Sequence, residues 1–298
     1  MPQTTTFITL GTAGGPVPNR YRAQPAHAVV TQDRTLLIDC GEGAMGQLMR
    51  AGIDFRNVHD IFISHHHFDH IGSLFACLGM NMMLQRKTPL NIYGPPGTRQ
   101  MIDALCSACD VPWGVGFGIR DQSLPHPRDF IHVREISSYD KVKIDQLDIS
   151  FCENTHYRGE ANFGQDGPIS LSLRFDAPDR SIVFTGDTGP CHNLENFAKG
   201  AQLLVGELMD AEGTMRRVRQ KNPLMSDVRI QMMGDHMTRH HLSPEQLGEL
   251  ATRAGVEHVV AVHIPLEGIH TKTAPKYIAK IASRFSGKIT LAEDLDRF

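Results

Sequence analysis

The chain has 298 residues and a formal net charge of −3, and 41% of its residues are hydrophobic and 21% charged. This balance excludes collagen, a coiled coil and a disordered chain, and it leaves room for one large domain or two small ones. The near-neutral charge also excludes a general polyanion binder, although a local basic patch is compatible with it. Histidine is over-used: there are sixteen, and four of them lie within residues 65–70.

Short β-type runs alternate with helical patterns along the whole chain. In chain order, the predicted strands are residues 7–10, 27–30, 35–38, 61–64, 90–93, 149–152, 169–175, 181–185, 203–205 and 258–262. The predicted helices are residues 44–51, 98–109 and 243–254. The last is the best marked, because Ser243 and Gln246 form a capping box around Pro244, and Gly255 supplies a stop. This mixture predicts an α/β (α+β) protein whose sheets are covered by helices.

The cysteines and the first residues of the chain indicate the cellular compartment of the protein. The six cysteines do not suggest a disulfide framework, and Cys106 and Cys109 lie in a helical pattern, which favours ordinary helix cysteines over a redox or zinc motif. The segment after Met1 lacks the charged and apolar regions of a signal peptide, and no apolar run approaches the length of a membrane span. We therefore expect a cytoplasmic protein without membrane association, unless Met1 is an artificial start that hides a removed leader.

One stretch carries the crowded histidines. An apolar run over residues 61–63 is followed by the pattern His65-x-His67-x-Asp69-His70. Alternation along an extended chain points His65 and His67 the same way, so both can reach one metal ion. Asp69 and His70 follow a turn and can serve a second ion, and such donors suit zinc, iron or manganese. The alternative, a solvated histidine-rich loop, explains neither the strand before the pattern nor the aspartate within it.

This pattern after a strand resembles the metal-binding motif of the metallo-β-lactamase superfamily of hydrolases. Three further motifs are similar to its ribonuclease Z branch, which processes the 3′ end of tRNA: LGTAGGP at residues 10–16, LIDCGEG at 37–43 and IYGPPG at 92–97. FTGDTGP at 184–190 resembles that branch and its arylsulfatase and cyclic-nucleotide phosphodiesterase relatives. The resemblance implies a single domain over residues 1–298, built as a four-layer αβ/βα sandwich with two metal ions at one edge of the sheets.

The resemblance also implies the remaining metal ligands. His156, Asp187 and His263 each end a predicted strand and match the family's later ligand motifs, and Asp187 would bridge the two ions. Asp69 would bind metal and also orient the attacking water. One ion would then be held by His65, His67, His156 and Asp187, and the other by Asp69, His70, Asp187 and His263.

In ribonuclease Z relatives, a Glu and a His outside the metal ligands protonate the leaving group, and the matching positions here are Glu207 and His241. His241 precedes the capped helix, whose N-terminus favours anions, so it could instead contact a phosphate or sulfate group. Its neighbour His240 is an alternative for the acid. The relatives usually carry His directly before the Glu, whereas this chain has Gly206, so the surroundings of Glu207 are expected to differ.

A pair of divalent ions activates a shared water and stabilises charge on substrate oxygens, so the predicted reaction is hydrolysis. Ribonuclease Z proper grips tRNA with a long Gly/Pro-rich arm between the third and fourth ligand motifs, but here only thirty residues separate His156 from Asp187. We therefore expect the substrate to be a small anionic ester, either a sulfate ester or a phosphodiester, and nucleic acid to be the less favoured partner. The expected cofactors are two divalent ions, zinc first, with iron or manganese possible.

Other functions are compatible with parts of the sequence. The first is tRNA 3′ processing itself, and the second is a lactonase or a β-lactamase-like carbonyl hydrolase, against which the ribonuclease Z-like motifs and the pair Glu207 and His241 argue. A nucleic-acid-binding module with vestigial metals would require broken ligand positions, and none is broken. A structural zinc protein would use closed, cysteine-rich sites.

The segment from about 209 to 240 is rich in Met and in basic residues. It is either a helical pair with a Met-filled core face and a solvated basic face, or a lid over the metals. As a lid, its Met side chains would form an adaptable wall, and Arg216, Arg239 and His240 would bind the substrate anion. The same Met side chains would suit the interface of a homodimer, which is the oligomeric state that we expect.

Overall fold

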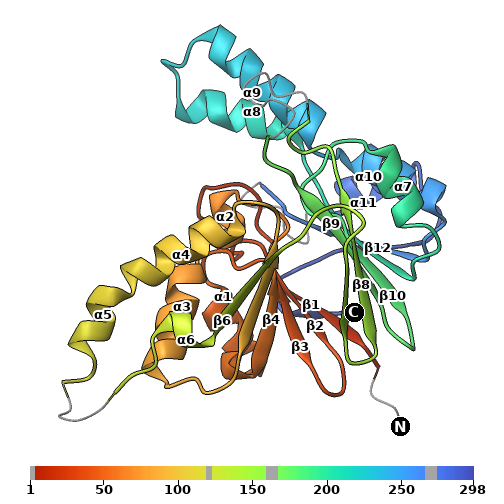
Figure 1. The fold of residues 1–298 in the computed structure, drawn as a ribbon. Coiled ribbons are helices and arrows are strands. Elements are labelled where there is room, and N and C mark those ends of the chain that lie inside the picture. Colours follow the sequence, from red (N-terminus) through yellow and green to blue (C-terminus); the bar gives the residue numbers. More distant parts are fainter. Residues whose placement is uncertain (1–3, 119–122, 159–166, 266–273) are drawn as a thin grey trace. The chain divides into compact units, whose positions relative to one another are not determined.

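The structure is a computed structural model that describes residues 4–118, 123–158, 167–265 and 274–298. The chain forms two compact units. Unit 1 comprises Met1–Gly11, Ala23–Ile136 and Asp294–Phe298, and unit 2 comprises Thr12–Arg22 and Ser137–Glu293. In the residues that the structure describes, each unit holds one sheet, drawn in Figure 1. The single domain over residues 1–298 stays a prediction.

Within the described residues, unit 1 contains a seven-stranded sheet in the order β14-β1-β2-β3-β4-β5-β6. Its strands are β1 (Thr6–Gly11), β2 (Ala26–Val30), β3 (Thr35–Ile38), β4 (Val58–Phe62), β5 (Leu90–Gly94), β6 (Ile131–Glu135) and β14 (Asp296–Arg297). The pairings from β14 to β3 are antiparallel, and those from β3 to β6 are parallel. The carboxyl ends of β3 and β4 therefore meet at one edge, where sites are usually built.

Helices cover one face of this sheet (Figure 1). They are α1 (Ala44–Arg50), the 3₁₀ turn η1 (Phe55–Asn57), α2 (Phe68–Ile71), α3 (Leu74–Met83), α4 (Thr98–Ala108), α5 (Asp110–Val115) and α6 (Pro127–Phe130). Buried side chains of α1, α3 and α4, among them Leu48, Leu78 and Ile102, pack against Ile61 and Ile92 of the sheet. This apolar core holds β4 rigidly, and the histidine-rich loop follows β4 directly.

The part of unit 2 that the structure describes contains a second seven-stranded sheet, in the order β13-β12-β11-β10-β9-β8-β7. Its strands are β7 (Lys141–Ile144), β8 (Leu147–Glu153), β9 (Leu171–Asp176), β10 (Ser181–Phe184), β11 (Leu203–Glu207), β12 (His258–Val262) and β13 (Lys288–Leu291). The pairings from β10 to β13 are parallel, and those from β7 to β10 are antiparallel. Strands β8, β10, β11 and β12 therefore all end at the same edge.

Helices α7 (His192–Phe197), α10 (Pro244–Ala254) and α11 (Ala274–Ala282) cover one face of this sheet (Figure 1). Helix α10 begins and ends as its sequence predicts. Ser243 Oγ accepts a hydrogen bond from the backbone N of Gln246, the side chain of Gln246 accepts one from the backbone N of Ser243, and Gly255 adopts a φ of 64°. Its apolar side chains, among them Leu247 and Leu250, are buried in one core with Leu204 and Val259 of the sheet.

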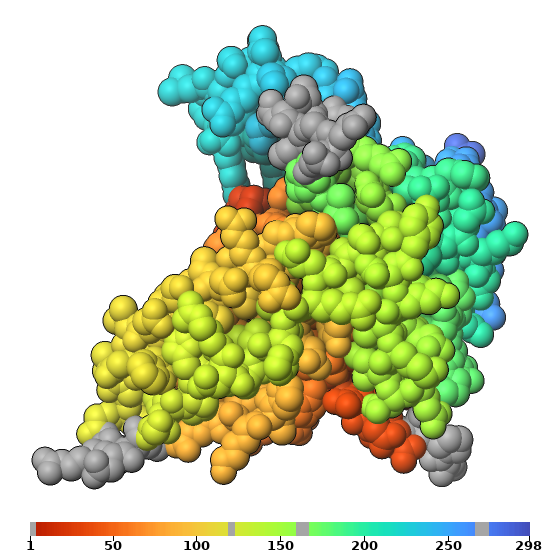
Figure 2. All heavy atoms as spheres, in the orientation of Figure 1, coloured from red at the N-terminus to blue at the C-terminus, as the bar shows by residue number. Residues whose placement is uncertain are grey.

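The segment between β11 and α10 forms a helical hairpin of α8 (Ala211–Lys221) and α9 (Asp227–His240). The Met side chains of the two helices are half-buried or exposed, so they do not fill a core. A role of the hairpin as a lid over the metals stays a prediction. The hairpin extends away from the rest of unit 2 (Figures 1 and 2). Its tip exposes two apolar side chains among polar ones, because Leu224 is 99% and Val228 71% accessible to solvent. Its base is closed by a hydrogen bond from the backbone N of Met209 to the carbonyl of Leu242, so the hairpin leaves and rejoins the fold at one point.

All predicted strands are present, and most differ from the observed ones by a few residues at an end. Strands β6, β7, β13 and β14 were not predicted. Strand β7 (KVKI) does alternate charged and apolar side chains, but it is only four residues long; β6 is mostly exposed and ends in two charged side chains, and β14 is two residues long. All six cysteines are free and buried, and burial raises the pKa of Cys106 to about 11, as suits ordinary helix cysteines. Among the described residues, no helix is long and apolar enough to cross a membrane.

Candidate metal centre

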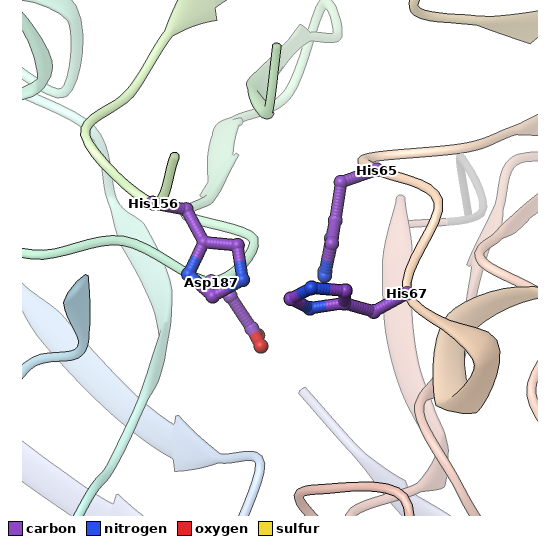
Figure 3. A group of neighbouring side chains, drawn as sticks. All are labelled: His65, His67, His156 and Asp187. Atoms are coloured by element: carbon purple, nitrogen blue, oxygen red, sulfur yellow. The ribbon is translucent and has the colours of Figure 1, made fainter. Parts of the chain in front are cut away.

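The loop after β4 presents the first group of predicted ligands in unit 1. His65 and His67 stand on this loop, as Figure 3 shows, and their rings meet edge to face with centroids 4.9 Å apart. Asp69 and His70 follow on the short helix α2, and Asp69 Oδ2 lies 3.6 Å from His70 Nε2. The four predicted ligands of this motif are thus gathered at the carboxyl end of β4.

Asp39, for which the sequence predicts no role, organises this group. It follows β3, the parallel neighbour of β4, and is fully buried. His70 Nδ1 donates to Asp39 Oδ2 at 2.7 Å, and the Ser64 hydroxyl donates to the same oxygen at 2.8 Å. That hydroxyl also lies 3.0 Å from His65 Nδ1. One carboxylate therefore orients two predicted ligands and fixes the tautomers in which their Nε2 atoms carry the lone pair.

Replacing Asp39 with Asn is expected to weaken zinc affinity about 10–100-fold while the fold is retained. Asn tolerates the left-handed backbone that Asp39 adopts at a φ of 57°. Its amide NH₂ must, however, face either the ring N–H of His70 or the backbone N–H of Ser64, so one hydrogen bond becomes a clash of donors. Zinc affinity measured by competition with a chelating dye checks this expectation.

The matched control is Asp60→Asn in the same sheet. Asp60 is also buried, but it accepts a hydrogen bond from Asn91 and faces none of the predicted ligands. This variant is expected to bind zinc like the unchanged protein. Equal zinc affinity in the Asp39 and Asp60 variants would show that Asp39 does not orient the ligands.

Unit 2 supplies His156, which follows β8. Its Nδ1 donates to the carbonyl of His240 at 3.0 Å, and its backbone N donates to Asn154 Oδ1 at 3.1 Å. Asn154 in turn donates to the carbonyl of Thr185 at the end of β10. The His156 ring is therefore oriented from the end of α9 as well as from the sheet, and its Nε2 carries the lone pair. His156 and Asp187 are labelled in Figure 3.

Asp187 and His263 meet at the ends of β10 and β12. The Oδ2 atom of Asp187 lies 3.1 Å from His263 Nε2, and both side chains are buried. Gly189, two residues after Asp187, lies so close to α9 that an added Cβ would stand 2.0 Å from the carbonyl of Arg239. This close approach explains the second glycine of the motif FTGDTGP.

Glu207 and His241 form a hydrogen-bonded pair beside these ligands. The Nδ1 of His241 lies 2.6 Å from Glu207 Oε2, and Glu207 Oε1 accepts a hydrogen bond from the backbone N of Thr188. Both residues are buried, and one donor atom from each of Asp187, Glu207, His241 and His263 lies within 4.8 Å of the others. The contact between Glu207 and His241 is direct, whereas His240, the alternative acid, is turned toward the carbonyl of Thr155.

Gly206, where relatives usually carry His, lies in the buried part of β11. An added Cβ at this position would come within 2.5 Å of Leu247 Cδ1 of helix α10. Leu247 is fully buried, so it fills the space that a side chain at position 206 would need. The side chain of Leu247 thus takes the place of the His side chain that relatives carry at this position. The Glu207 carboxylate keeps its contact with His241.

The three residues predicted to bind substrate occupy different positions. His240 is buried and links the end of α9 to the His156 loop through Thr155. Arg216 is exposed on α8, with Glu212 as a distant ion-pair partner at 3.8 Å. Arg239 is exposed near the end of α9. A substrate contact for these three residues stays a prediction.

A pocket of about 320 Å³ lies at the base of the hairpin, within unit 2. His241 lines it together with Met209 and Met237, the N-terminal residues of α10 and Lys280 of α11. Its volume is at the small end of the range for ligand pockets. There is thus room for a small group beside His241.

The donor atoms fit divalent cations. Two ligands of a tetrahedral zinc ion with bonds of about 2.0–2.1 Å lie roughly 3.3 Å apart. The Asp69–His70 distance of 3.6 Å and the Asp187–His263 distance of 3.1 Å match this spacing. Each is a carboxylate with an imidazole, a combination that zinc, iron and manganese accept. The two His/Asp groups therefore indicate divalent metal binding.

The chain matches one family model and is similar to curated proteins over nearly its whole length. The family model described as "Anti-Pycsar protein Apyc1" matches residues 5–208. A ribonuclease Z of Mycolicibacterium gilvum is 27% identical over 97% of this chain and 94% of its own length. The likeness to that relative thus extends through the hairpin and α10, beyond the end of the family match.

Two solved structures show the fold. The metallo-beta-lactamase fold protein YhfI of Bacillus subtilis has a TM-score of 0.71 at 17% identity, over 99% of both chains. Human tRNase Z, short form, has a TM-score of 0.66 at 20% identity, over 98% of both chains. These likenesses confirm the predicted α/β fold of the metallo-β-lactamase type.

Proposed function

The chain belongs to the family described as Anti-Pycsar protein Apyc1, within the metallo-β-lactamase superfamily of metal-dependent hydrolases, and we propose that it cleaves a small phosphodiester whose leaving group is an alkoxide. The observation that carries this proposal is the buried hydrogen bond between Glu207 and His241. A poor leaving group such as a sugar alkoxide departs only with a proton, and a carboxylate-oriented imidazole is suited to supply it. A good leaving group would need no such pair.

Our assignment of the metal ligands supports the same chemistry. We assign His65, His67, His156 and Asp187 to one ion, and Asp69, His70, Asp187 and His263 to the other. Such ions, when bound, lower the pKa of a coordinated water and neutralise charge on the phosphate oxygens. Asp69 would orient the water. His241 would hold its proton at Nε2, opposite the Nδ1 that Glu207 engages, and deliver it to the departing oxygen.

Two features support a small substrate. Only thirty residues separate His156 from Asp187, which leaves no room for a long tRNA-gripping arm between these two residues. The pocket of about 320 Å³ beside His241 suits a group the size of a nucleobase rather than a polymer. A cyclic nucleotide meets both conditions, because its leaving alkoxide belongs to its own ribose. A sulfate ester stays the less supported variant of the same proposal.

The second candidate function is tRNA 3′ processing. The relative named ribonuclease Z matches 97% of this chain, and its likeness includes the region of Glu207 and His241. Under this candidate, Arg216 of α8 and Arg239 of α9 would contact the RNA backbone. A homodimer and a cytoplasmic location remain predictions under either candidate.

A single substrate panel separates these functions. The zinc-loaded protein, and separately the manganese-loaded protein, is incubated with 3′,5′- and 2′,3′-cyclic nucleotides, bis-p-nitrophenyl phosphate, p-nitrophenyl sulfate, a lactone and a precursor tRNA. We expect the highest kcat/KM on a cyclic nucleotide. A precursor tRNA cut at its 3′ end with a higher kcat/KM would establish the second candidate instead. Hydrolysis of the sulfate or the lactone alone would refute the phosphodiesterase proposal.

A further inference from the structure

Helix α9 turns a row of imidazoles toward the predicted metal ligand His156. His236 and His240 lie one helical turn apart on the same face, and His241 follows directly after the helix. The His236 ring centroid lies 5.0 Å from that of His240, 6.0 Å from that of His241 and 6.3 Å from that of His156. All four residues belong to unit 2, so this cluster is a feature of one unit.

In three of these imidazoles, the Nδ1 atom contacts a carbonyl or carboxylate oxygen. His156 donates to the carbonyl of His240, His240 lies 3.2 Å from the carbonyl of Thr155, and His241 lies 2.6 Å from Glu207. His236 differs in position, because it stands one turn farther out along α9 and is half-buried. Its ring therefore borders both the acid and a metal ligand from a place that solvent reaches. A core-packing role would favour an apolar side chain there.

We infer that His236 binds the phosphate group of the substrate and so determines which esters the site accepts. An imidazole donates an N–H hydrogen bond in either protonation state, so this contact does not require a charged ring. The ring lies close enough to His241 for one phosphodiester to contact His236 through a non-bridging oxygen and His241 through its leaving oxygen. The inference rests on the proposed function for its substrate class, and it identifies a specificity-determining residue outside the predicted ligand and acid sets.

The test measures binding and turnover separately. The variants are His236→Ala, His236→Gln and Arg229→Ala. Arg229 is the matched control, because it lies on the same face of α9, seven residues before His236, and carries a full positive charge. For the zinc-loaded proteins, isothermal titration with inorganic phosphate gives Kd, and bis-p-nitrophenyl phosphate gives kcat and KM. Zinc content is measured for each variant.

His236→Ala is expected to raise the phosphate Kd and the KM about tenfold and to leave kcat within about threefold, since a hydrogen bond to an anion is lost. His236→Gln, which retains an N–H near the position of Nε2, is expected to recover most of the binding. Arg229→Ala is expected to stay within about twofold of the unchanged protein in both measurements.

Unchanged phosphate binding in His236→Ala would overturn the inference, and so would an equal loss in Arg229→Ala, which would indicate general electrostatic attraction by the hairpin. A fall in zinc content in His236→Ala would also overturn it, because His236 would then act by supporting His156. Phosphate titration does not need turnover. Failure of the proposed function would therefore appear as an inactive unchanged protein, whatever the phosphate Kd of the variants shows.

Discussion

Replacing Asp187 with Ala is expected to lower the metal content from about two ions per chain to one or fewer and to reduce kcat/KM at least about a thousandfold. Asp187 is the carboxylate assigned to both ions, and its Oδ2 lies 3.1 Å from His263 Nε2. Removing it takes one donor from each ion and leaves buried imidazoles without their anionic neighbour. Metal analysis by mass spectrometry and hydrolysis of bis-p-nitrophenyl phosphate measure the two effects.

The control for this variant is Asp176→Ala at the end of β9. Asp176 pairs with Arg174 and is far more exposed than Asp187, so its loss should change neither quantity. A chelator should abolish activity in the unchanged protein, and the order in which zinc, iron and manganese restore it identifies the preferred metal. An Asp187→Ala protein that keeps two ions per chain would disprove the assignment of Asp187 as the bridge.

His241→Ala is expected to reduce kcat/KM about 10²–10⁴-fold for substrates with an alkoxide leaving group and only a few-fold for those that release nitrophenolate. The reason is that nitrophenolate departs without a proton, whereas an alkoxide needs one at the moment of bond cleavage. Comparing a cyclic nucleotide with bis-p-nitrophenyl phosphate on the same protein measures the difference. Metal content should stay unchanged, since His241 is not assigned as a ligand.

Glu207→Gln should reproduce part of this pattern, because Glu207 holds His241 by the 2.6 Å hydrogen bond. The double variant should be no slower than His241→Ala alone, since groups that act as a unit lose their effect together. His258→Ala is the matched control: His258 starts β12, at the end opposite His263, and lies 3.0 Å from Thr290 Oγ1. Equal losses on both substrate types in His241→Ala would assign His241 to substrate binding instead of proton transfer.

The sequence predicted the parts of this molecule that local pattern encodes. The pattern from His65 to His70 follows a buried strand, and the capping box at Ser243 and Gln246 marks the start of α10 as observed. Both signals lie within a few consecutive residues, so neither needs the fold to be known. The family resemblance added His156, Asp187 and His263, which by themselves are unremarkable residues at the ends of strands.

The residues that escaped prediction depend on contacts between distant segments. Asp39 matters because β3 pairs in parallel with β4, which brings its carboxylate to Ser64 and His70. Glycine fits at position 206 because Leu247 fills the adjacent space, and Leu247 lies 41 positions further along the chain, on a different element. The two-residue strand β14 exists only because the C-terminus returns to pair with β1. Such pairings are set by the tertiary fold, and no pattern within a short window reports them.

The position of the hairpin has a consequence for how this site can change in evolution. Glu207 and His241 are 34 positions apart in the chain and touch at its base, so everything between them is a loop whose two ends are already fixed. Lengthening such a loop costs little, because closure entropy rises only with the logarithm of its length. An exchange of α8 and α9 for another segment would therefore alter the surroundings of His241, while His241 keeps its position and its contact with Glu207. The hairpin is in this sense a replaceable cassette, and chimaeras that swap it between relatives should transfer substrate preference together with the segment.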